Sequence, residues 1–181
     1  MPLNPADVHP LAFSLLEARS GKPIPLSASE FTPQELPPNL LSTDPKQLFP
    51  HARDAAAALS GLLLIAGHWE LSHQIAQDVS SREGSYWHAI AHRIEPDTWN
   101  SGYWFRRVGE HPIFAALNEH ANGLPGASNA GWRAQTHWDP QAFLAFCDDA
   151  RAASGSAKYE YAQQIQLAEC EFLFLWCALA R

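Results

Sequence analysis

Prolines are concentrated at the start of the chain, and their placement restricts that segment to extended or short helical structure. Ten of the 14 prolines lie in residues 1–50. Because proline fixes φ and lacks an amide hydrogen, the segment cannot form a long helix or an inner strand. We expect residues 1–50 to form a proline-rich arm with at most a short helix near 11–18, and residues 51–181 to form a helical domain.

Helix-start signals recur after the arm. Asp44-Pro45 and Asp139-Pro140 each place a capping side chain before a first-turn proline. We expect helices over about 51–79, 85–95, 98–108, 112–120, 139–153 and 158–180, the first bent or broken at Gly61 or Gly67. Apolar residues do not alternate with period two over a useful length. The predicted class is therefore all-α, a single helical bundle of about five to seven helices with the proline-rich N-terminal arm.

Charge and hydropathy argue against two classes of partner. The formal net charge of −7 disfavours nucleic-acid binding, which needs a basic field, although contact through a local Trp/Arg segment is a third, weaker hypothesis. The longest apolar runs are far shorter than the roughly 20 residues that span a bilayer, and the N-terminus has no signal-peptide pattern. No CxxC pair occurs. We expect a cytoplasmic protein with reduced thiols and no membrane contact.

The stretch SYWHAIAHRIEPDTWNSGYWFRRVGEHP, residues 85–112, is unusually rich in histidine, tryptophan and arginine. In a helix over its first half, Trp87 and Ile90 fall on an apolar arc, whereas His88 and His92 lie on the opposite side. Two histidines four residues apart can bind one metal. The alternative is a solvated or hydrogen-bonded pair, and the choice depends on whether another segment covers them.

A carboxylate and a third histidine complete the candidate metal site. Glu169 falls in the middle of the apolar stripe of the last helix, where an unpaired charge is costly, so it predicts a partner. That partner is either an arginine in a buried ion pair or a metal held with the histidines. Glu70 and His73 form a Glu-x-x-His pair, but di-metal bundles need two such pairs and the chain has one. The candidate ligands for Zn, Mn, Fe or Ni are His73, His88, His92 and Glu169.

Aromatic and basic residues suggest a second kind of site. Arginine presents a bidentate fork to anions, and interleaved aromatic rings can stack on a planar ligand. The ordinary alternative is an aromatic helix whose arginines pair with acids. No Ser-His-Asp order, GxSxG, P-loop, GxGxxG or HExxH pattern occurs. The candidate residues for a small anionic ligand are Arg93, Tyr103, Trp104, Arg106, Arg107 and His111.

The same stretch resembles the signature of a family of uncharacterised bacterial and fungal proteins. That signature reads roughly WHAIxHRREPDxxNxxYWFRRVGxHP and follows a leucine-rich helix ending in SHxIxQ, which here is Ser72-His73, Ile75 and Gln77. The likeness covers residues 61–114. This chain has Ile94 where the signature has a second arginine, which leaves Arg93 as the carrier of any arginine role. The family has no established activity, so the resemblance implies a motif and no mechanism.

Two main functional hypotheses follow. The first is a small-molecule site lined by His, Glu and Arg between helices, with metal dependence and enzymatic activity both left open. The second is a non-catalytic interaction or homo-oligomerisation module that uses exposed aromatic residues and the N-terminal arm. A metal measurement and the oligomeric state distinguish them.

Overall fold

Helices make up the architecture of this protein. The computed structural model describes residues 5–180, and within that range it contains ten α-helices and no strand, which confirms the all-α prediction. Three 3-10 turns, η1 (Pro5–Asp7), η2 (Ala28–Glu30) and η3 (Leu40–Ser42), lie in the arm. The helices are α1 (Pro10–Arg19), α2 (Pro45–Leu48), α3 (Ala55–Ile65), α4 (Trp69–Asp78), α5 (Arg82–Ile94), α6 (Thr98–Val108), α7 (Phe114–Gly123), α8 (Ala127–Ala130), α9 (Pro140–Arg151) and α10 (Ala157–Ala178).

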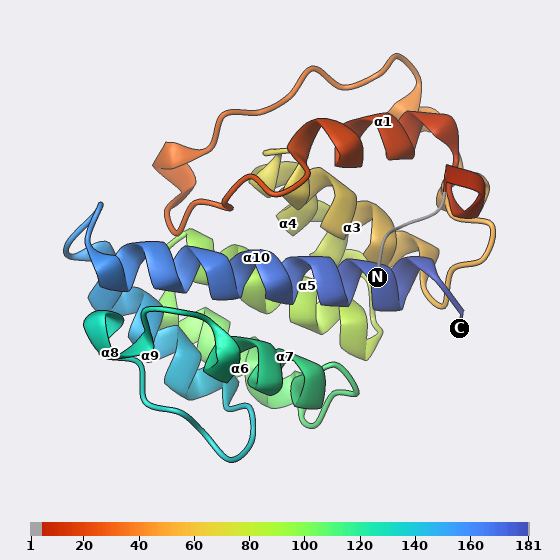
Figure 1. Cartoon of the computed structure of the whole chain (residues 1–181). Helices are drawn as coiled ribbons and strands as arrows, with labels where there is room; N and C mark the ends of the chain where they lie inside the picture. The colour runs from red at the N-terminus through yellow and green to blue at the C-terminus, as the bar shows by residue number, and fades with distance from the viewer. Residues whose placement is uncertain (1–4, 181) are drawn as a thin grey trace.

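Helix α5 lies at the centre of the bundle. It packs against α3, α4 and α6, and the long helix α10 runs across the molecule (Figure 1). Every residue of α5 from Gly84 to Ile94 is buried. The face that carries the histidines is therefore covered by protein, as is the apolar face.

Local sequence sets the helix ends. Asp54, Asp97 and Asp139 each cap a helix through a side-chain oxygen that accepts a backbone N–H. The long helix expected over 51–79 is broken into α3 and α4 at Gly67, whose φ is +93°. A Cβ at this glycine would lie 2.7 Å from the backbone oxygen of Thr32. The break therefore needs glycine both for its φ and for the close approach of the arm.

The N-terminal arm belongs to the same hydrophobic core as the helices. Ile24, Leu26, Leu48 and Phe49 are fully or almost fully buried within it. Gln166 of α10 donates from Nε2 to the backbone oxygen of Ile24 at 3.3 Å and to that of Pro25 at 2.7 Å. The arm lies along one side of α3 and α10 in Figure 1 and carries the helix α1. Its extended segments are thus fixed by burial and by side-chain hydrogen bonds.

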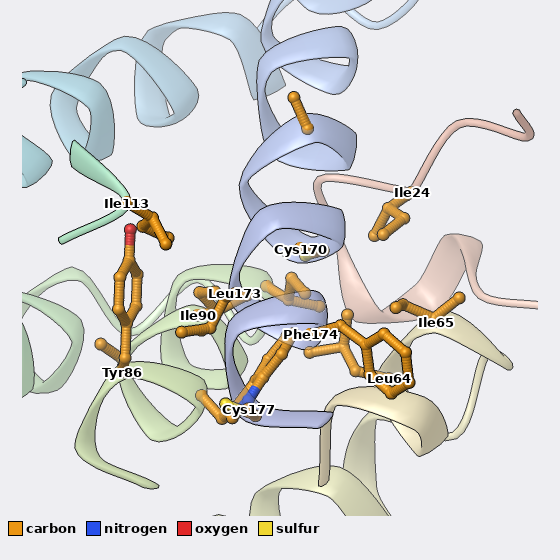
Figure 2. Packing of buried hydrophobic residues seen from close by; sticks show 14 of the residues in the cluster. Ile24, Leu64, Ile65, Tyr86, Ile90, Ile113, Cys170, Leu173, Phe174 and Cys177 are labelled. Atoms are coloured by element: carbon orange, nitrogen blue, oxygen red, sulfur yellow. The ribbon is translucent and has the colours of Figure 1, made fainter. Parts of the chain in front are cut away.

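Helix α10 divides the core into two sides. Figure 2 shows Tyr86 and Ile113 on one side of this helix and Ile24 and Ile65 on the other. The three cysteines of the chain are buried and unbridged, and burial raises the pKa of Cys147 to about 11. Among residues 5–180, no helix is both long and apolar enough to cross a membrane.

Candidate metal centre

Three histidines from two helices converge on one point. His73 extends from α4, and His88 and His92 extend from successive turns of α5. The Nε2 atom of His73 lies 2.8 Å from Nε2 of His88 and 3.3 Å from Nε2 of His92. Ligand atoms of the three side chains all lie within 4.8 Å of one another. Helix α4 positions His73 and helix α5 positions the other two histidines, and these two helices pack against each other.

Burial keeps the imidazoles of His73 and His88 neutral. It lowers the pKa of His88 to about 3, with further lowering by His73 and His92. Burial also lowers the pKa of His73, and the neighbouring His92 adds to this effect. A neutral imidazole has one nitrogen lone pair free to accept a proton or to bind a metal. His73 and His88 therefore present neutral nitrogen ligands at neutral pH.

Glu95 orients the third histidine. Its Oε2 atom lies 3.1 Å from Nδ1 of His92, three residues earlier in the chain. A neutral His92 that donates from Nδ1 to this carboxylate has its lone pair on Nε2, the atom that faces His73. Carboxylates commonly hold the outer nitrogen of metal-binding histidines in this way.

Protons alone cannot satisfy both close contacts of His73. Its Nε2 atom carries at most one hydrogen but has two nitrogen neighbours at hydrogen-bond distance. The single in-plane site of this nitrogen, whether it holds a hydrogen or a lone pair, can serve one neighbour and leaves the other contact unsatisfied. A cation between the three nitrogens satisfies all of them at once. The Nδ1 atom of His88 is buried and has no hydrogen-bond partner among the described residues.

An aromatic wall leads from the histidines to the surface. The ring of Trp104 lies 4.2 Å from that of His88, centroid to centroid, and the guanidinium of Arg107 lies 5.0 Å from the Trp104 centroid. Tyr103 is 39% exposed and Trp99 is 73% exposed, and their rings are parallel to within 9°. One side of the cluster is thus bordered by aromatic surface and a positive charge.

Glu169 does not join the histidines, so its inclusion among the metal ligands is wrong. Its Oε2 atom forms an ion pair with Nη2 of Arg93, and its Oε1 atom accepts a hydrogen bond from the Tyr86 hydroxyl at 2.8 Å. Arg93 also donates from Nε to Oε1 of Gln166 at 3.1 Å. Burial acts to lower the pKa of Arg93, but the Glu169 carboxylate outweighs it, so the pKa lies above its ordinary value. The carboxylate in the apolar stripe is explained by this ion pair.

The remaining candidate residues are dispersed. Arg93 is fully buried in the ion pair and is not accessible to a ligand. His111 is buried near Tyr86 and Trp176, and its Nδ1 atom accepts a hydrogen bond from the Ile113 amide at 3.3 Å. Arg106 and Arg107 are exposed on α6. Three of the six residues proposed for an anionic ligand therefore border the histidine cluster. Trp104 contacts His88, and Tyr103 and Arg107 contact Trp104.

Sequence spacing could have identified one further residue beside the cluster. Glu95 lies three residues after His92, a spacing that brings side chains together on a helix. Trp104 had no such signal, because its contact with His88 depends on how α6 packs against α5. Comparison with known proteins adds no relative: no family model, no curated protein and no solved structure matches this chain. The resemblance to the uncharacterised family stays a prediction.

Proposed function

We propose that His73, His88 and His92 bind a divalent transition metal through their Nε2 atoms, and that the metal acts on a small anionic molecule. The observation that carries the proposal is the convergence of three Nε2 atoms, with separations of 2.8 and 3.3 Å from His73. Zinc–nitrogen bonds of about 2.0–2.1 Å imply nitrogen separations of about 3.3 Å in a tetrahedral site. The two separations from His73 are close to that value, and ligand atoms of all three side chains lie within 4.8 Å of one another.

The ligand set favours a reactive site over a purely structural one. Structural zinc sites are closed by four protein ligands, whereas catalytic sites have three and leave a position for water or substrate. Three histidines with no carboxylate among them match the second type. Such a metal, when bound, polarises a substrate oxygen or lowers the pKa of bound water.

The residues around the cluster have separate roles in this proposal. Glu95 holds the His92 ring and its tautomer. Trp104 packs on His88 and excludes water from that side of the cluster. Arg107 supplies the positive charge that attracts an anionic group to the aromatic border.

Metal content tests the proposal. The protein is produced without a histidine tag, purified without chelator and analysed for Zn, Mn, Fe and Ni. We expect close to one metal per chain, or a rise in melting temperature when one of these ions is added, because a ligand that binds only the folded state stabilises it. His92→Ala should abolish both effects. The matched control is His137→Ala, which removes an exposed histidine outside the cluster. Metal-free protein that ignores all four ions would overturn the proposal.

Cobalt substitution tests the substrate class. Visible absorption of Co(II) responds to changes in its coordination, so small carboxylates that bind at the open position should alter the spectrum. Arg107→Gln should weaken this response while leaving metal stoichiometry unchanged. An unchanged spectrum with every anion tested would contradict the anionic substrate and leave the metal site standing.

The exposed aromatic residues support a second candidate function, in which Trp99 and Tyr103 form a protein contact. Both side chains are exposed and stack on each other, and Trp and Tyr are enriched at interfaces. Light scattering of the wild-type chain and of Trp99→Ala tests it. A wild-type monomer at high concentration would exclude self-association through this surface.

A further inference from the structure

A cavity separate from the histidine cluster of α4 and α5 lies beside α10. It has a volume of about 430 Å³ and lies between α1, the segment that follows it, and α10. Most of its lining is apolar, including Phe13, Leu16, Ile24, Ile65, Phe172 and Phe174. Figure 2 shows Ile24, Ile65 and Phe174 together beside α10. None of the three clustered histidines lines it, so it is a separate site.

Arg19 places a partly desolvated positive charge at this cavity. Its Nε atom donates to the backbone oxygen of Ile65 at 3.0 Å, and its Nη2 atom donates to that of Pro23 at 3.2 Å. These two bonds hold the guanidinium in place and leave Nη1 without a partner among the described residues. Burial lowers the pKa of Arg19, and no acidic side chain within the described part of the chain forms an ion pair with it.

We propose that this cavity binds a medium-chain fatty acid, with the acyl chain among the apolar residues and the carboxylate on Arg19. Apolar ligand cavities typically measure about 300–1,000 Å³ and carry a few polar groups that fix orientation. If a methylene takes up about as much room as a water molecule, roughly 30 Å³, then the cavity holds a chain of about ten to fourteen carbons. Arginine is suited to a carboxylate because its planar donors match the two oxygens.

The other charged residues at the cavity carry both signs. Lys22 adds a second positive group from the arm. Glu17 and Glu171 also line the cavity and are exposed to solvent, and partial burial raises the pKa of Glu171, so its carboxyl takes up a proton more readily than usual. Arg19 is held at the cavity by its two hydrogen bonds to the backbone, so a ligand carboxylate is expected to pair with this residue. Removal of Glu171 should leave fatty-acid binding unchanged or tighten it.

A chain-length series tests the proposal on the full, lipid-stripped chain. Calorimetric titration with octanoate, decanoate and dodecanoate below their micelle concentrations should show affinity rising by up to about fourfold per methylene, because each buried methylene is worth about 0.8 kcal/mol. The rise should stop once the chain exceeds the cavity. Dodecylamine, with the same chain and the opposite charge, should bind at least tenfold more weakly than dodecanoate.

Variants separate the charge from the space. Arg19→Gln should weaken dodecanoate binding by tenfold or more, and Arg19→Lys should retain part of it. Leu16→Trp should block the cavity without altering a charge, and Glu171→Gln is the matched charge control. Circular dichroism verifies that each variant is folded.

The proposal is wrong if none of the three acids binds, or if dodecylamine binds as tightly as dodecanoate. It is also wrong if dodecanoate binding survives both Arg19→Gln and Leu16→Trp. Binding to phospholipid vesicles without binding to free acid would overturn it as well. A stable dimer that is abolished by Leu16→Trp would likewise overturn it, because a second copy would then occupy this surface. These outcomes are independent of the metal measurements.

Discussion

The side chains of Arg93 and Glu169 form an ion pair in which neither has any exposed surface. They come from α5 and α10, two long helices that meet in the core. The Tyr86 hydroxyl donates to the second carboxylate oxygen, and Gln166 accepts from Arg93. Because both charges are desolvated, each depends on the other for its stability inside the protein.

Removal of one partner should therefore destabilise the fold strongly. We expect Glu169→Leu to lower the free energy of unfolding by roughly 3–5 kcal/mol, because it leaves the Arg93 charge buried without compensation. Tyr86→Phe, which removes one hydrogen bond, should cost about 1 kcal/mol. Urea unfolding measures both. The double variant Arg93→Met with Glu169→Leu should recover much of the loss, and a double variant as unstable as Glu169→Leu would contradict this account.

Glu95 should affect metal affinity without affecting the fold. Glu95→Gln weakens the acceptor for the His92 Nδ1 hydrogen, and loss of such a partner typically lowers metal affinity by about 10–100-fold. The side chain of Glu95 is 43% exposed, so stability of the metal-free protein should change little. Competition with a coloured zinc chelator measures the affinity. Glu70→Gln, an exposed acid on α4, is the control and should behave as wild type.

Gly61 should not tolerate a side chain. A Cβ at this position would lie 2.4 Å from Cζ2 of the fully buried Trp87 ring. We expect Gly61→Ala to destabilise the protein by about 1–3 kcal/mol through overpacking, despite the better helix propensity of alanine. Gly123→Ala at the end of α7 is the comparison, because its Cβ would have no neighbour within 4 Å. Equal melting temperatures for the two variants would show that Trp87 can move.

Stability of the metal-free protein should fall as the solution becomes acidic. Burial lowers the pKa of His111 to about 4 and that of His88 to about 3, from an ordinary value near 6.5. Below pH 6.5 the unfolded chain binds protons that these folded histidines do not, so the free energy of unfolding decreases from about pH 6.5 towards pH 4. Urea unfolding at several pH values measures the slope. His111→Asn, which can still accept from the Ile113 amide, should show a smaller slope between pH 6.5 and 4.

The helices were largely predictable because their signals are local. Aspartates before Pro45 and Pro140 marked helix starts, and the break at Gly67 followed from its conformational freedom. Residues 98–108 form α6 as expected. How the helices pack was less predictable, because it depends on contacts between residues far apart in the sequence. The bundle has more helices than the expected five to seven, since the first long helix divides, the arm supplies α1 and α2, and the short helix α8 follows α7.

The candidate site was predictable only where one helix carried the signal. The spacing of His88 and His92 placed both on one face, but which helix covers that face depends on the turn after α4. The position of Glu169 in an apolar stripe indicated a buried partner. It did not say which one, because Arg93 and the histidines lie on different faces of the same helix α5. The orientation of α5 about its own axis, relative to α10, decides whether Glu169 meets Arg93 or the histidines.

The place of α10 in the bundle has a consequence for synthesis of the protein. This helix contacts α3 near the beginning of the bundle and α7, α8 and α9 near its end. It also supplies Gln166 to the arm and Glu169 to Arg93. A nascent chain that lacks residues 157–178 must therefore hold an unpaired arginine and an open core as it leaves the ribosome. Co-translational folding of this protein should be delayed until that helix has been made, and partial chains should depend on chaperones.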